Sequence, residues 1–161
     1  MASWNEILDK FGHMPSQYDL VRREYLRQLS DYTGRNTILY YSSWLQKSLL
    51  ANGTFDFGIN DNTGFMTCIY KLDKTRGLDL ILHTPGGDIS ATESLVVYLK
   101  SIFGKDIRVI IPQMAMSAGT MISCCAKEII MGKHSNLGPI DPQYGPYRAH
   151  GIIEEFVTIK Q

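Results

Sequence analysis

One stretch of the sequence combines a stiff residue with two flexible ones in a way that could stabilise an anion. This is the turn "TPGG" at residues 84–87. Pro85 fixes its own φ angle, while Gly86 and Gly87 permit backbone conformations that a side chain would block. Backbone N–H groups in such a turn can point into a cleft instead of into a β-ladder. We therefore predict that Gly86 and Gly87 contribute donors to an oxyanion hole.

A second stretch, "AMSAG" at residues 115–119, begins about thirty residues further along and contains a serine among small residues. We expect Ser117 to open a helix, where unpaired N–H groups and the helix dipole favour nearby negative charge. The small neighbours leave room for a substrate carbonyl group, and the Ala118 N–H would be a second oxyanion donor. A glycine turn facing a serine is the minimal apparatus for acyl transfer with Ser117 as nucleophile. Taken singly, the turn is also explained as a simple turn and the serine as a helix N-cap.

A serine hydroxyl is a weak nucleophile, so hydrolysis needs a base within about 3 Å of it. His83 ends the segment directly before the glycine turn and would act as base if its ring faces the cleft; the alternative is a buried structural histidine. Asp141 lies in a loop expected to border the site, where it would orient a histidine or hold the loop by turn hydrogen bonds. Lys160 would need desolvation to be neutral at pH 7. The identity of the base stays open among these residues and any that lie beyond the chain end.

The elements that must position these residues follow a regular alternation. Short apolar runs predict buried strands, and apolar residues at three- and four-residue steps predict helices. Strands that alternate with helices of this length imply parallel pairing and an α/β fold with a mostly parallel sheet. We predict strands at residues 36–45, 78–83, 107–112 and 128–132, and helices at residues 16–31, 65–72 (capped by the preceding Asn/Asp group), 89–103, 117–127 and 152–161.

This topology predicts that the two reactive stretches are neighbours. Right-handed crossover of the helix at 89–103 would place the strand at 78–83 beside the strand at 107–112. Sites in open parallel sheets form outside the carboxyl ends of the strands. The glycine turn and the serine each follow one of these ends.

The same residues resemble a known superfamily. "TPGG" is similar to the glycine motif of the Clp protease proteolytic subunit and of signal peptide peptidase A, which are crotonase-like proteins. More closely, "GLDLILHTPGGDISATESLVVYL", "AMSAGTMI" and "HSNLGPIDPQ" resemble the bacterial serine dehydrogenase proteinase group. The similarity covers roughly residues 25–160.

The resemblance implies a β-β-α spiral fold, a Ser117 nucleophile, a peptide or protein substrate and assembly into a homo-oligomer. Two departures concern the base. Where the Clp peptidase has its histidine, this chain has Ile140 or Asp141. In single-repeat relatives of signal peptide peptidase A the base is a lysine farther downstream than Lys160. We expect a single domain over residues 1–161 with an N-terminal helical extension at about 1–33, and the early stop favours a truncated C-terminus.

Composition excludes several other classes of function. The chain has 16 basic and 16 acidic residues, so no bulk field attracts nucleic acid or an anionic membrane. The basic stretch around Arg22 and Arg23 is interrupted by an acid and is explained as the solvated face of a helix. No apolar run reaches the roughly 20 residues needed to span a bilayer, and the start lacks signal-peptide features, so we expect a cytoplasmic protein.

The cysteines do not indicate a disulfide framework or a metal site. There are three of them, an odd number, with no CxxC spacing, and we expect small buried thiols at Cys68, Cys124 and Cys125. We therefore predict no metal and no cofactor.

Three functions fit these observations. The first is a serine peptidase or related hydrolase that forms an acyl-enzyme at Ser117. The second is a non-catalytic assembly or protein-binding module that keeps the fold without a working base. The third is an acyl-CoA enzyme of the wider crotonase group, which would use paired N–H donors to stabilise an enolate; the chain has no distinctive basic cluster for the CoA phosphates.

Overall fold

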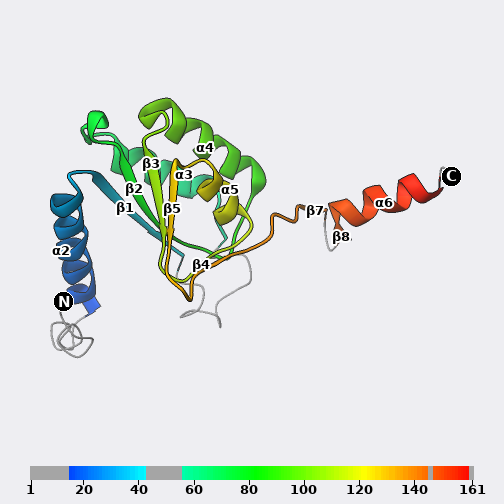
Figure 1. Ribbon diagram of the computed structural model, residues 1–161, viewed down its shortest axis with the longest axis horizontal. Coiled ribbons are helices and arrows are strands. Elements are labelled where there is room, and N and C mark those ends of the chain that lie inside the picture. Colours follow the sequence, from blue (N-terminus) through cyan, green and yellow to red (C-terminus); the bar gives the residue numbers. More distant parts are fainter. Residues whose placement is uncertain (1–14, 43–55, 145–146, 160–161) are drawn as a thin grey trace.

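The computed structural model describes residues 15–42, 56–144 and 147–159 (Figure 1). Within these ranges the helices are α2 (Pro15–Thr33), α3 (Ile59–Ile69), the 3-10 turn η1 (Lys74–Arg76), α4 (Ile89–Phe103), α5 (Ala118–Cys124) and α6 (Ala149–Ile159). The strands are β1 (Asn36–Tyr41), β2 (Leu78–His83), β3 (Ile107–Ile111), β4 (Met114–Ala115), β5 (Glu128–Met131), β6 (Asn136–Leu137), β7 (Gln143–Tyr144) and β8 (Tyr147–Arg148).

The main sheet is parallel and has the order β1-β2-β3-β5. In register, Leu80 of β2 lies between Ile38 of β1 and Val109 of β3. A strand covered on both faces must be apolar almost throughout, which explains the sequence "LDLILH" of β2. The α/β class with a mostly parallel sheet is confirmed, as is the prediction that β2 and β3 are neighbours. The spiral arrangement stays a prediction.

Three helices, α3, α4 and α5, cover one face of the sheet, while α2 lies on the opposite side against β1 (Figure 1). The core lies between the sheet and these three helices. Helix α4 shows why the sequence folds this way: its buried residues include Ala91, Leu95, Leu99 and Phe103, at steps of four that fall on one helix face. Asp88 begins the helix by accepting a 2.7 Å hydrogen bond from the Ala91 N–H.

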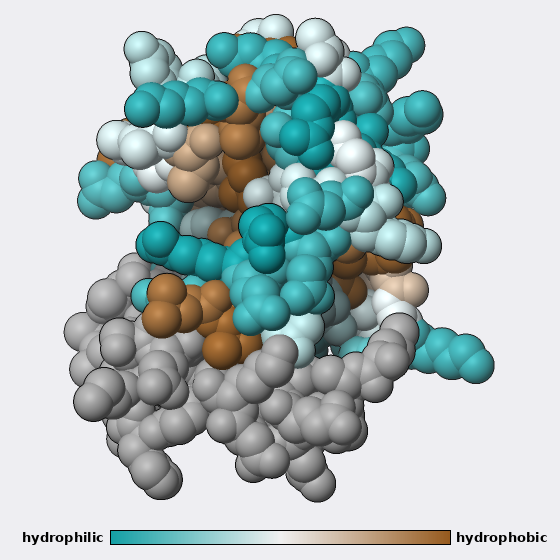
Figure 2. All heavy atoms as spheres, turned by 90° about the vertical axis from the view of Figure 1, so that its left-hand side faces the viewer, coloured by the Kyte–Doolittle hydropathy of each residue, from teal (hydrophilic) through white to brown (hydrophobic). Residues whose placement is uncertain are grey.

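The face of the sheet turned away from these helices contains a buried ionic group. The Asp79 carboxylate, in the middle of the sheet, is fully buried and accepts hydrogen bonds from Arg35 at 2.6 Å and from Arg108 at 2.6 Å and 2.8 Å. On the side of the molecule where α2 lies, hydrophobic side chains form a narrow band bordered by hydrophilic ones (Figure 2).

Two small sheets were not predicted. Strand β4 pairs in parallel with β6, and β7 forms an antiparallel pair with β8. Each strand has only two residues, which is too short to produce a periodic sequence signal. Beyond them, α6 extends away from the main sheet (Figure 1). No helix in the described ranges is long and apolar enough to cross a membrane.

Some predicted boundaries need correction. Helix α3 begins at Ile59, ahead of the Asn/Asp group, and Asp61 accepts a hydrogen bond from the Gly58 N–H from inside the first turn. Helix α5 ends at Cys124, three residues before the predicted end. Strand β1 ends at Tyr41; the predicted continuation at residues 43–45 lies outside the described residues.

The prediction of three buried thiols was wrong for two of them. Cys68 and Cys124 are exposed, and only Cys125 is buried. Burial raises the pKa of the Cys125 thiol, because the charged thiolate is disfavoured away from water.

Candidate active site

The glycine turn and the serine lie against each other at the carboxyl ends of β2 and β3. A short parallel bridge aligns them: the Thr84 N–H donates to the Met114 carbonyl at 3.2 Å, and the Met116 N–H donates to the Thr84 carbonyl at 3.0 Å. A Cβ atom built on Gly86 would lie 3.0 Å from the Ser117 Cβ. The predicted juxtaposition of the two stretches is therefore present.

Ser117 adopts an unusual backbone conformation. Ser117 lies directly before the first residue of α5 and has a φ of 46° and a ψ of −106°. It is the one non-glycine residue with positive φ among those the structure describes. Such a conformation is costly for a residue with a side chain and persists only where the surroundings enforce it. Ser117 occupies the N-cap position of α5, but its side chain makes no capping hydrogen bond.

The glycine turn uses one amide internally, and its next amide has no hydrogen-bond acceptor among the described residues. The Gly86 N–H donates to the Thr84 hydroxyl at 3.2 Å. Phe57 pairs with one edge of the turn, since its N–H donates to the Gly86 carbonyl and its carbonyl accepts from the Asp88 N–H, both at 2.8 Å. In a parallel bridge of this kind the Gly87 N–H faces away from Phe57.

Glycine is required at both turn positions. Gly86 and Gly87 have φ angles of 125° and 157°, which residues with side chains rarely adopt. A Cβ on Gly87 would overlap the backbone of Phe57. These contacts explain why the sequence has two consecutive glycines here.

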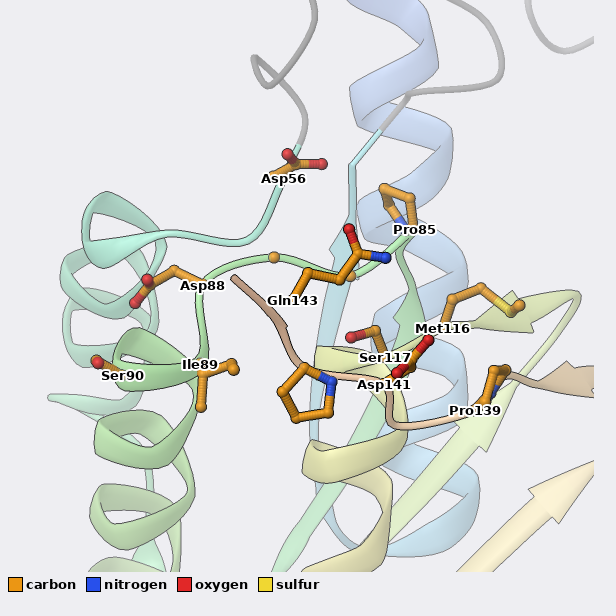
Figure 3. A pocket seen from close by; sticks show the side chains of 13 residues that line it. Asp56, Pro85, Asp88, Ile89, Ser90, Met116, Ser117, Pro139, Asp141 and Gln143 are labelled. Atoms are coloured by element: carbon orange, nitrogen blue, oxygen red, sulfur yellow. The ribbon is translucent and has the colours of Figure 1, made fainter. Parts of the chain in front are cut away.

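An open cavity of about 660 Å³ lies in front of Ser117 (Figure 3). This volume falls in the range typical of ligand sites. Ile89 and Ser90 line it from the start of α4, across from Ser117, and the segment after β6 closes a further side. The lining residues are Asp56, Pro85, Gly86, Gly87, Asp88, Ile89, Ser90, Met116, Ser117, Pro139, Asp141, Pro142 and Gln143.

His83 does not line this cavity. A Cβ on Gly119 would lie 3.9 Å from the Leu82 side chain, so Leu82 faces α5. Successive residues of a strand point to opposite faces, which turns His83 away from α5. Its ring lies 4.9 Å from that of Tyr41, centroid to centroid, and the residue as a whole is 4% exposed.

The environment of His83 disfavours its charged form. Neither ring nitrogen has a hydrogen-bond partner in the described ranges. Burial lowers the pKa of His83 from its ordinary value of 6.5, and the nearby Gln113 side chain opposes this effect in part.

Asp141 and Lys160 are the two other candidate bases, and Asp141 lines the same cavity as Ser117. Asp141 lines the cavity together with Ser117, and both side chains point into it (Figure 3). The Asp141 carboxylate forms a 3.1 Å ion pair with Arg148, an exposed side chain of β8. Lys160 lies outside the described residues.

Three carboxylates, from Asp56, Asp88 and Asp141, line the cavity, and the described lining includes no lysine, arginine or histidine. Asp88 is already used to cap α4. The described part of the chain contains no group of three or more His, Cys, Asp and Glu residues placed to hold a metal ion.

The sequence alone did not identify two contributors to the site. Asp56 comes from a segment far from both motifs, and no local pattern marks it. Thr84 is the first residue of the predicted turn, but its hydroxyl contact with Gly86 depends on a backbone conformation that periodicity does not reveal.

Comparisons with known proteins show which family this chain belongs to. The chain is 35% identical over 139 residues to the uncharacterized protein MJ0137 of Methanocaldococcus jannaschii, covering 86% of this chain and 48% of the relative. It is 33% identical over 148 residues to the uncharacterized protein MJ1495 of the same organism, covering 91% of this chain and 50% of that relative. The chain thus spans about half the length of these curated relatives. A family profile, described as ClpP-like SDH-type serine proteinase, matches residues 10–161, and the chain therefore belongs to this family.

Proposed function

We propose that this chain hydrolyses peptide bonds through an acyl-enzyme intermediate on Ser117. The Ser117 Oγ attacks the substrate carbonyl carbon and its proton passes to a base, and the C–N bond then breaks as the leaving amine takes up a proton. Water next attacks the ester, which releases the acid and restores the serine. The single observation that carries the proposal is the position of Ser117: it has a strained backbone, makes no capping hydrogen bond and lies against the glycine turn at the wall of a cavity.

In this proposal the oxyanion donors are the N–H groups of Gly87 and Ala118. The Ala118 N–H, at the first position of α5, has no acceptor within the helix. The Gly87 N–H lies on the edge of the turn opposite Phe57, and Gly87 lines the cavity. Gly86 holds the turn in place, because its own N–H is bonded to Thr84.

We assign the acid–base step to Asp141 rather than to His83. Asp141 shares the cavity with Ser117, whereas the His83 ring is buried next to Tyr41 on the other face of the sheet. The Asp141 carboxylate would accept the hydroxyl proton directly or through one bridging water.

A fluorophosphonate probe tests the proposal, because it phosphonylates activated serines. We expect one adduct per chain by intact-mass measurement, and none in Ser117→Ala. Ser94→Ala, on the exposed face of α4, makes the same chemical change away from the cavity and should label normally. We expect Asp141→Asn to label at least tenfold more slowly, since proton transfer by a positioned group contributes about 10²–10⁴-fold. Equal labelling of wild type and Ser117→Ala would contradict the assignment of Ser117 as the nucleophile.

A second function, assembly without catalysis, is favoured by one observation. Helix α6 extends from the main sheet, and its side chains Ile153 and Val157 are 59% and 57% exposed. A short helix in water gains little stability alone, so a partner surface, such as a second copy of this chain, would stabilise it. Sedimentation analysis that finds a stable oligomer, together with an unlabelled Ser117, would favour this function over hydrolysis.

A further inference from the structure

The contacts of Thr84 connect the two halves of the candidate site. Thr84 is fully buried between β2 and the glycine turn. It does not line the cavity, so it cannot contact a substrate there. Its hydroxyl, its backbone and its methyl group each contact a different part of the site.

The hydroxyl of Thr84 fixes the turn. It accepts a 3.2 Å hydrogen bond from the Gly86 N–H and lies 3.3 Å from the Gly86 carbonyl oxygen, to which it donates. Gly86 is itself buried, so without this hydroxyl its N–H would lose its partner away from water. The hydroxyl thereby favours the turn conformation in which the Gly86 N–H is bonded inside the turn.

The rest of Thr84 contacts the nucleophile segment. Its backbone bonds to Met114 and Met116 set the chain that leads into Ser117. Its methyl group packs against α5 so closely that a Cβ on Gly119 would lie 2.6 Å from it. One buried side chain therefore sets the distance between the proposed oxyanion donors and the nucleophile.

We propose that Thr84 is a positioning residue for the oxyanion hole, acting through the Gly86 N–H, which is bonded to its hydroxyl. The inference rests on the proposed acyl-enzyme function. In this inference the Thr84 hydroxyl maintains the turn geometry, while the methyl group mainly packs against α5.

Two variants separate these roles. Thr84→Val keeps the shape of the side chain and removes the hydroxyl, whereas Thr84→Ser keeps the hydroxyl and removes the methyl group. Thr37→Val is a matched control, because the Thr37 hydroxyl on β1 is buried, has no hydrogen-bond partner among the described residues and lies away from the cavity lining. Each protein is assayed below its own unfolding temperature, so that only folded protein is compared.

The first measurement is the rate constant for fluorophosphonate labelling of Ser117. Loss of one oxyanion donor costs about 10²–10³-fold in other serine hydrolases. We expect Thr84→Val, which misplaces a donor without deleting it, to label about 10- to 100-fold more slowly than wild type. Thr84→Ser and Thr37→Val should stay within about threefold of wild type. An unchanged rate in Thr84→Val, or an equal loss in Thr84→Ser, would overturn the proposal.

The second measurement does not depend on catalysis. Hydrogen–deuterium exchange of the Gly86 amide should be at least tenfold faster in Thr84→Val than in wild type and should be restored in Thr84→Ser. If wild type is not labelled at all, the hydrolase function fails while this measurement still decides whether Thr84 holds the turn. Unchanged exchange of the Gly86 amide in Thr84→Val would show that the hydroxyl does not position it.

Discussion

At the scale of single residues, Ser117 combines a rare backbone conformation with a side chain that makes no capping hydrogen bond. A serine before a helix usually caps it through its side chain. Ser117 has a left-handed φ of 46°, and its side chain makes no capping hydrogen bond. The backbone strain is therefore not offset by a hydrogen bond from the side chain to the helix. Strain that local hydrogen bonding does not offset is found mostly at functional positions. Ser117 lines the cavity in this conformation.

His83 permits a prediction about acid sensitivity. Its folded-state pKa lies below the unfolded value of 6.5, so below about pH 6.5 the unfolded chain binds a proton that the folded chain does not. Stability should therefore fall as the pH decreases from 7 to 5, by up to about 1.4 kcal/mol per pH unit.

His83→Phe keeps a ring beside Tyr41 and removes both unpartnered nitrogens. We expect this variant to be more stable by about 1 kcal/mol at pH 7, since a buried unsatisfied polar group costs about 1–3 kcal/mol. It should also lose the part of the acid sensitivity that His83 causes. Urea unfolding at pH 7.5, 6.5 and 5.5 measures both effects, and identical pH slopes for the two proteins would refute the assignment.

At the scale of elements, β2 combines an apolar strand with one buried charge. Burial acts to raise the pKa of Asp79, but hydrogen bonds from Arg108 and Arg35 outweigh it and hold the pKa below its usual value. The strand keeps its ionised carboxylate because arginines from a neighbouring strand and from the residue before β1 reach it. This pairing links β1, β2 and β3 on the face opposite the core helices.

Asp79→Asn should destabilise the protein by about 3 kcal/mol at pH 7, because removing one partner of a buried pair typically costs about 3–5 kcal/mol and both arginines keep some exposure. A depressed pKa contributes stability above the unfolded value of 3.8 that is lost as the pH falls through the folded value. The difference between wild type and variant should therefore shrink below about pH 4.

Urea unfolding between pH 7 and pH 3.5 measures this convergence. Asp19→Asn is the control, because its ion pair with Arg22 on α2 is exposed and should contribute less than about 1 kcal/mol. A stability difference for Asp79→Asn that stays constant across this range would show that the charge of Asp79 does not cause it.

At the scale of the whole molecule, stability resides in the layer between the main sheet and helices α3, α4 and α5. The largest fully buried side chains come from β2, β3 and these three helices, together with Phe57 and Thr84 at the glycine turn. Helix α6 forms several contacts with β8 but extends from the sheet (Figure 1). The candidate site lies at the edge of the stable layer, where loops from different strands meet.

This distribution predicts a contrast between two truncations. Leu99→Ala removes a fully buried side chain of α4 and should cost about 2–5 kcal/mol. Ile153→Ala changes an exposed residue of α6 and should alter the stability by less than about 0.5 kcal/mol. Chemical unfolding of both variants checks this. A large loss in Ile153→Ala would mean that α6 is packed against a surface, as in the assembly function.

The sequence by itself determined the class of fold and the two motifs. Apolar runs and helical periodicity are local properties, so β2 and α4 were predicted with the bounds that the structure has. The consecutive glycines Gly86 and Gly87 indicate a tight turn from the sequence alone, because few other residues tolerate their backbone angles. The pairing of β2 with β3 then followed from the handedness of crossover connections.

Only the tertiary structure decided which of His83 and Asp141 lines the cavity. His83 lies next to the glycine turn in sequence, yet the alternation of a strand turns it to the other face; Asp141, distant in sequence, lines the cavity with Ser117. The strain at Ser117 and the bond from Gly86 to Thr84 likewise depend on contacts between segments. Local sequence patterns indicate which helix or strand a residue belongs to. Which side chains come into contact depends on how those helices and strands pack against one another.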